Sequence, residues 1–228
     1  MRILICFFMI SLSSCANHTN QFLSQLPLWN DKSQKIGVII GNTSAPSAYK
    51  DGHINFAGNK PNDHDSLQLN KHLKTLNIAN LTDVALDITQ QLKNKGLDVK
   101  FLPEKMSLKS LRKSDMKSSI QALVNFDHKT LKSRHNIDKL VVIDLVRIGT
   151  IRNYYGFVPV NEAHGLSHLD AYVINLNKRQ LEWKKSVIKK IKTTTTTPNA
   201  NLQFDGITKA VLLAFDQSKH SLISHFSE

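Results

Sequence analysis

The run from Lys139 to Ile148 constrains the fold of this chain more than any other segment. Its centre, LVVIDLV at residues 140–146, is apolar at consecutive positions rather than at alternate ones. Successive side chains of a strand point to opposite faces, so a strand of this kind has to be buried on both of them. The run therefore predicts the central strand of a sheet that is covered on both sides.

Four further segments have strand character. Residues 35–41 and 98–102 are short apolar runs, the second ended by Pro103. Residues 166–176 and 181–191 are two more strands, joined by a tight hairpin. Between the first and second of these segments, residues 42–65 are rich in Gly, Pro, Asn and Asp and are expected to form a long loop.

Helical spacing of apolar residues predicts the helices. The clearest pattern begins at Asn80, which can cap the helix, and ends before Gly96. A second helix is expected over residues 114–134 and a final one around residues 207–215, while a helix start near Asp65 stays open.

These segments follow one another in the order β-α-β-α-β-β-β-α. The two strand–helix–strand connections favour parallel strands with right-handed crossovers, and the hairpin adds antiparallel ones. We expect an α/β fold, on the border with α+β, with a single mixed sheet of about five strands and helices packed on it. The chain of 228 residues suits one such domain, over residues 35–228.

The first fifteen residues have the architecture of a secretory signal. Arg2 precedes an apolar run at residues 3–10 that is too short to span a bilayer. The segment closes with LSSC at residues 12–15, which resembles the lipobox of bacterial lipoproteins. The resemblance implies that residues 1–14 are a signal peptide and that Cys15 becomes the lipidated first residue, carrying palmitate or another acyl chain. A plain secretory signal with an incidental Cys15 is the alternative.

Residues 15–34 are then expected to be a polar tether. Cys6 would leave with the signal, so Cys15 would be the one cysteine of the mature chain. Ala16 stands where, in enteric-type lipoproteins, an aspartate would favour the inner membrane. The sequence thus predicts a periplasmic domain that lipid on Cys15 anchors to the cell outer membrane, and that folds without a disulfide.

The element order over residues 35–222 resembles that of a group of envelope lipoproteins and periplasmic domains. The group includes the penicillin-binding-protein activator LpoB, the curli secretion protein CsgG and the amino-terminal domain of TolB. A local match is the segment YYGFVP at residues 154–159, followed after the hairpin by LEW at residues 181–183. None of these motifs implies an activity.

Motifs of common active sites are missing from the sequence. Gly41 ends a strand, but neither a Gly-Lys-Ser/Thr ending nor a GxGxxG pattern follows it. There is also no GxSxG nucleophile elbow, and Cys15 would be the sole mature thiol. We therefore expect no catalytic residues and no cofactor.

Two sets of polar residues need an interpretation. His164, His168 and Asp170 would share one face of a strand and could bind a metal, but Gly165 suggests that His164 precedes the strand. We expect exposed histidines and no metal site. Asp144 lies inside the most apolar run, where a carboxylate has to be paired or hydrogen-bonded. It is either a catalytic acid or, as we expect, a carboxylate paired with Lys or Arg or placed at a sheet end.

The chain is strongly basic, with 30 Lys and Arg against 18 Asp and Glu, a formal charge of +12. Nucleic acid is the usual partner of such a protein, but the export signal argues against it. Anionic headgroups or peptidoglycan carboxylates are better candidates, and solvated lysine faces are the simplest explanation. One predicted strand carries five of the lysines: Lys184, Lys185, Lys189, Lys190 and Lys192.

The sequence favours a non-enzymatic binding or assembly module that acts on another envelope component. An envelope-polymer hydrolase, and a subunit of a lipoprotein ring or secretion assembly, are the alternatives, and the oligomeric state is open. Tyr154, Tyr155 and Phe157 are the candidate partner surface, because exposed aromatic side chains are enriched where proteins meet. Alternatively, these rings fold back onto the core.

Overall fold

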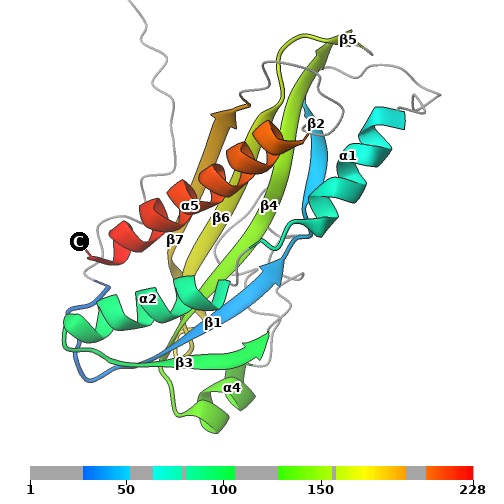
Figure 1. The fold of residues 1–228 in the computed structure, drawn as a ribbon. Coiled ribbons are helices and arrows are strands. Elements are labelled where there is room, and N and C mark those ends of the chain that lie inside the picture. Colours follow the sequence, from blue (N-terminus) through cyan, green and yellow to red (C-terminus); the bar gives the residue numbers. More distant parts are fainter. Residues whose placement is uncertain are drawn as a thin grey trace, which may run out of the picture.

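An open, mixed sheet forms the body of this protein (Figure 1). The computed structural model describes residues 28–51, 64–78, 81–105, 128–155, 158–193 and 204–227. Its strands are β1 (Lys35–Thr43), β2 (Ser47–Asp51), β3 (Asp98–Lys105), β4 (Lys139–Tyr155), β5 (Val158–Pro159), β6 (His164–Asn175) and β7 (Gln180–Lys192). Its helices are α1 (His64–Thr75), α2 (Leu81–Asn94), α4 (His128–His135) and α5 (Asp205–Ser227).

The main path of the sheet runs β3-β1-β4-β6-β7. β1 pairs in parallel with β3 and β4, whereas β6 pairs antiparallel with β4 and β7. This confirms the mixed α/β sheet and its five principal strands. The expected element order is incomplete, because two short strands, β2 and β5, also pair with β4.

β2 corrects the predicted loop over residues 42–65. It pairs in parallel with residues 149–153 of β4, beyond the stretch of β4 that β1 borders. Two strands therefore follow one another along the same side of β4. The residues of β2 are no more than half-buried, so this strand has no apolar run that would reveal it in the sequence.

β4 is longer than predicted, with 17 residues. Tyr154 and Tyr155, expected in a connecting loop, are its last residues and pair with Pro159 and Val158 of β5. β3 also runs past its predicted end, through Pro103 to Lys105. Proline is tolerated there because β3 is the outermost strand of the described sheet and its register with β1 shifts at this point.

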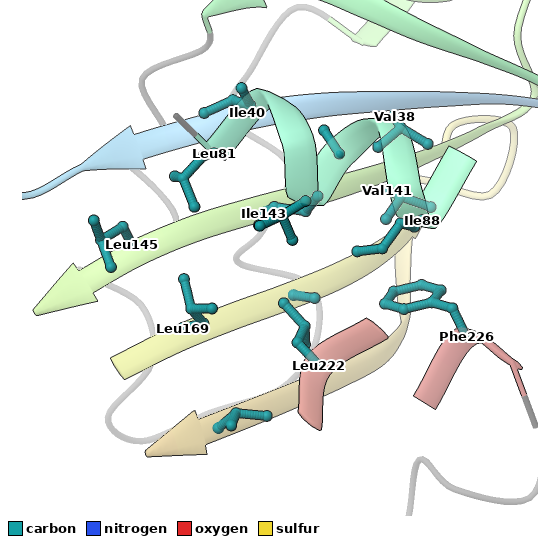
Figure 2. Close-up of a cluster of buried hydrophobic side chains, with 14 of the residues drawn as sticks. Val38, Ile40, Leu81, Ile88, Val141, Ile143, Leu145, Leu169, Leu222 and Phe226 are labelled. Carbon is teal, nitrogen blue, oxygen red and sulfur yellow. The ribbon is translucent and has the colours of Figure 1, made fainter. Parts of the chain in front are cut away.

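The larger hydrophobic core lies between the sheet and α1, α2 and α5, which cover one face (Figure 1). In Figure 2, Leu81 and Ile88 of α2 and Leu222 and Phe226 of α5 lie against the apolar side chains of the strands. The buried residues of α2 are Leu81, Val84, Ala85, Ile88, Thr89 and Leu92, which confirms the predicted helical stripe. Gly96, at φ 76°, ends the helix as expected.

A smaller core lies on the opposite face. Leu131 of α4 and Ile137 pack there with Leu140 and Val142 of β4 and with Tyr172 of β6. The central strand is therefore buried on both faces, as its sequence predicted. Most of the helix expected over residues 114–134 lies outside the described residues.

The described chain begins at the same end of the molecule as β4. Lys139, the first residue of β4, donates from Nζ to the carbonyl oxygen of Leu28 at 2.9 Å. The ring of Trp29 lies 6.2 Å from that of Phe226. Among the described helices, none is both long enough and apolar enough to cross a bilayer.

Candidate functional site

Several of the side chains singled out by the sequence gather with further residues at two places. The first, called here the Asp170 cluster, consists of His168, Asp170, Tyr172, Lys184 and Ser186. The second, the tyrosine tip, consists of Tyr154, Tyr155 and Val160. Cys15 and Phe157 lie outside the described residues.

The Asp170 cluster forms on the face of the sheet opposite α5. His168, Asp170 and Tyr172 alternate along β6 and so share that face, and Ser186 of β7 is the register partner of Asp170. His168 Nε2 and Ser186 Oγ lie 2.9 Å and 2.5 Å from Asp170 Oδ1. The Tyr172 hydroxyl donates to Oδ2 at 2.8 Å, and Lys184 Nζ lies 3.8 Å from Oδ2.

These donors keep Asp170 ionised. Burial of the carboxyl group acts to raise its pKa, but the hydrogen bonds from His168, Ser186 and Tyr172 together outweigh burial. They lower the pKa of Asp170 from 3.8 to about 2. An acid with so low a pKa is ionised at neutral pH, so it has no proton to give and is a weak base.

The arrangement differs from a Ser–His–Asp catalytic triad. In a triad the serine hydroxyl bonds to the histidine, which removes its proton. Here Ser186 and His168 both bond to the same carboxylate oxygen, and the other ring nitrogen of His168, Nδ1, is buried without a hydrogen-bond partner among the described residues. The geometry therefore suits a cluster that ties β6 to β7, rather than one that activates a nucleophile.

Of the three residues considered as a metal site, His168 and Asp170 are in contact and His164 is apart from them. His168 and Asp170 are hydrogen-bonded, but His164 Nδ1 lies 3.0 Å from the carbonyl oxygen of Glu162 instead. His164 is the first residue of β6, which corrects the expectation that it precedes the strand. Within the described residues, no group of three or more His, Cys, Asp or Glu side chains could hold a metal ion.

Asp144 is almost fully buried, with 1% of its surface exposed. It lies in the middle of β4 rather than at a sheet end, and its Oδ1 accepts the backbone N–H of Asn42 at 2.8 Å. Gly41 makes room for it, because a Cβ at that position would lie 2.0 Å from Asp144 Oδ1. The sequence suggested no second acid beside Asp144, but the register of β4 and β6 places Asp170 directly opposite.

The tyrosine tip lies at the far end of β4, where β4 turns into β5 (Figure 1). Tyr155 is 77% exposed and Val160 is 60% exposed. Tyr154 is half-buried, and Lys50 Nζ lies 5.1 Å from the centre of its ring. Neither tyrosine belongs to the two cores described above.

Hydrogen bonds between the two arms hold this tip in shape. Val160 N–H donates to the carbonyl oxygen of Asn153 at 3.0 Å, and Asn153 N–H donates to the side chain of Asn161 at 2.9 Å. Arg152 Nε donates to the carbonyl oxygen of Asn161 at 2.7 Å. The exposed side chains of Tyr155 and Val160 thus stand on a hydrogen-bonded hairpin, which is a suitable base for a contact surface.

Comparison with known proteins identifies no family for this chain. No protein-family model and no curated protein matches it. The solved structures that it resembles include the hypothetical protein CT253 from Chlamydia trachomatis, with 6% identity, 85% of this chain and 96% of that chain covered, and a TM-score of 0.40. They also include the lipoprotein GNA1162 from Neisseria meningitidis, with 10% identity, coverage of 85% and 98%, and a TM-score of 0.35.

A PelC dodecamer from Paraburkholderia phytofirmans is a third similar structure. Its identity is 7%, the match covers 78% of this chain and 87% of that chain, and the TM-score is 0.31. Similarities at these scores do not establish a common fold, so the function of this chain has to be inferred from its own residues.

Proposed function

We propose that this chain is a lipoprotein of the bacterial envelope that acts as a binding or assembly module and has no enzymatic activity of its own. Lipid on Cys15 holds it to the outer membrane, and the folded domain lies in the periplasm. The lipobox at residues 12–15 supports the anchor. The observation that carries the binding role is the exposure of Tyr155 and Val160 on a hydrogen-bonded hairpin.

A protein partner fits the tip better than a small ligand does. Small ligands bind in concave sites that bury most of their surface, whereas the tip ends a projecting strand pair (Figure 1). Aromatic side chains on a convex surface are typical anchors of protein interfaces. The tip therefore contacts the partner, and the Asp170 cluster supports the sheet from which it projects.

Site-specific photo-crosslinking in the producing cells tests this proposal. A photoreactive phenylalanine at position 155 should capture one defined envelope protein, which mass spectrometry can identify. Leu86 of α2, which is 47% exposed, supplies the control position and should not capture that protein. Equal yields of the same product from positions 155 and 86 would refute the tip as the partner surface.

An envelope-polymer hydrolase is the rival function, and the buried pair Asp144 and Asp170 is the observation that favours it. Acid–base hydrolysis by two carboxyl groups needs one that keeps its proton, and the low pKa of Asp170 argues against that role for this residue. A surface pocket lined by Lys35, Ile36, Asp98, Lys100, Asn136 and Ile137 contains neither acid. Incubation of the purified protein with peptidoglycan should release no soluble fragments, and release that Asp144→Asn abolishes would establish the rival.

A further inference from the structure

The outer edge of β7 carries an unusual concentration of positive charge. β7 has 13 residues and, within the described part of the chain, pairs only with β6. Its other edge therefore presents backbone N–H and C=O groups that no described strand uses. Long unpaired edges template pairing with another strand, so the side chains on this edge decide which strand can approach it.

Three lysines, spread over both faces of β7, have no acidic partner among the described residues. Lys184 lies near Asp170 and Lys192 Nζ lies 3.0 Å from Glu162, but Lys185, Lys189 and Lys190 form no ion pair with a described residue. Lys185 and Lys189 share the face of Val187, which packs in the core beneath α5. Lys190 shares the opposite face with Ser186, which contacts Asp170.

This alternation favours a strand over a flat surface as the ligand. A membrane surface meets an edge from one direction, whereas an added strand lies in the plane of the sheet and points side chains to both faces. Acidic residues of such a strand would lie across from lysines on either face, and opposite charges in cross-strand pairs are stabilising. Ile188, 47% exposed, adds an apolar contact on the same edge.

We propose that the outer edge of β7, over residues 184–192, binds an acidic, extended segment of another protein by strand addition. The same lysines exclude a second copy of this chain, because pairing two β7 edges would bring like charges together. This surface shares no residue with the tyrosine tip, so either proposal can fail without the other.

A peptide probe tests the proposal on the full chain in detergent. The peptide has nine residues, with glutamate across from each lysine of residues 184–192 in antiparallel register and valine or threonine elsewhere. Fluorescence anisotropy should show saturable binding that weakens as salt is raised. A matched peptide with lysine in place of glutamate should not bind.

Two variants with equal charge change locate the binding. Lys185→Gln/Lys189→Gln/Lys190→Gln should weaken binding about tenfold, the sum expected for three lost cross-strand charge pairs. Lys71→Gln/Lys74→Gln/Lys93→Gln removes three exposed lysines from α1 and α2 and should leave binding unchanged. Equal loss in both variants would show that net charge alone attracts the peptide, and would overturn the proposal.

An N-methylated peptide separates strand addition from plain charge attraction, and it needs only the unaltered protein. Methyl groups on those backbone amides of the peptide that would face β7 remove the N–H donors needed for pairing with the strand, and they leave every charge in place. This peptide should not bind measurably. Binding equal to that of the unmethylated peptide, or loss of all peptide binding when the micelles contain phosphatidylglycerol, would assign the edge to a general anionic surface and overturn strand addition.

Discussion

Asp170 shows how one side chain can join two strands of a largely apolar sheet. A buried carboxylate is costly unless donors surround it, and His168, Tyr172 and Ser186 supply them. Asp170→Asn keeps the shape but removes the charge that these donors stabilise. We expect the free energy of unfolding to fall by about 2 kcal/mol at pH 7, from the pKa shift of roughly two units, as measured by urea denaturation.

The control for this change is Ser186→Ala, which removes one donor and leaves the charge. Ser186→Ala should lower the free energy of unfolding by about 1 kcal/mol, which is less than the loss expected for Asp170→Asn. Equal stability of Asp170→Asn and the unaltered protein would mean that the cluster does not stabilise the fold.

The pH dependence of stability follows from the same residue. The pKa of Asp170 is about 2 in the folded protein, below the ordinary value of 3.8, so the folded state binds this proton less readily than the unfolded state. The contribution of the ionised Asp170 carboxylate to the free energy of unfolding is complete above about pH 4 and disappears as the pH falls towards 2. The stability difference between the unaltered protein and Asp170→Asn should therefore shrink between pH 4 and pH 2, and a constant difference would contradict this assignment.

The sequence could place part of this cluster but not all of it. The alternation of His168, Asp170 and Tyr172 is visible in the sequence, because strand parity alone determines it. The position of Ser186 is not visible in the sequence. If the pairing of Asn175 with Gln180 at the hairpin continued without a shift, Lys185 would lie opposite Asp170. A register shift between Val173 and Ile174 moves β7 by one residue and brings Ser186 there instead. Such bulges leave no clear trace in composition.

At the level of elements, apolar runs and helical periodicity were sufficient for the five long strands and for α2, because burial dictates those patterns. They failed for β2, whose half-buried residues carry no run, and for the extension of β4 into the segment that ends at Tyr155. Both segments are strands because of what they pair with. β2 pairs with a part of β4 that is distant in sequence, and the end of β4 pairs with β5, which follows it directly. Pairing of that kind is a property of the sheet, which local sequence does not encode.

The junction of β2 and β4 depends on Gly149. This residue has a φ of 133°, and a Cβ there would lie 2.0 Å from the carbonyl oxygen of Ser47. We expect Gly149→Ala to lower the free energy of unfolding by about 3 kcal/mol, since strain and a backbone clash add. Gly96→Ala, with a positive φ but no nearby backbone, should cost only about 1 kcal/mol. Similar costs in thermal or urea unfolding would show that β2 does not need this close approach.

The hairpin of β4 and β5 should contribute to recognition more than to stability. Tyr154→Ala/Tyr155→Ala removes one exposed ring and one half-buried ring that contacts Lys50. The loss of that cation–π contact predicts a cost of about 1 kcal/mol or less in the free energy of unfolding, while the protein identified by crosslinking should no longer co-purify with the variant. A cost of several kcal/mol, as for buried aromatic side chains, would instead assign the rings to the core.

For the molecule as a whole, the proposed lipid anchor at Cys15 would determine where the domain works. Cys15→Ser removes the only acceptor that the lipobox offers, so labelling of cells with a radioactive fatty acid should yield no labelled protein. The variant should also leave the membrane fraction, because a domain without acyl chains has lost their burial of about 0.8 kcal/mol per methylene. Undiminished label in this variant would refute lipidation at Cys15.

The position of β4 also has a mechanical consequence. The described chain begins at Leu28, beside the first residue of β4, while Tyr155 is the last of the 17 residues of that strand, about 50 Å away at the usual rise per residue. A partner that pulls on the tip of an anchored molecule would draw β4 and its parallel neighbour β1 in opposite directions along their length. Every hydrogen bond between the two strands would share that load at once, instead of opening one after another, so in an anchored molecule the sheet would transmit tension from the proposed partner to the membrane.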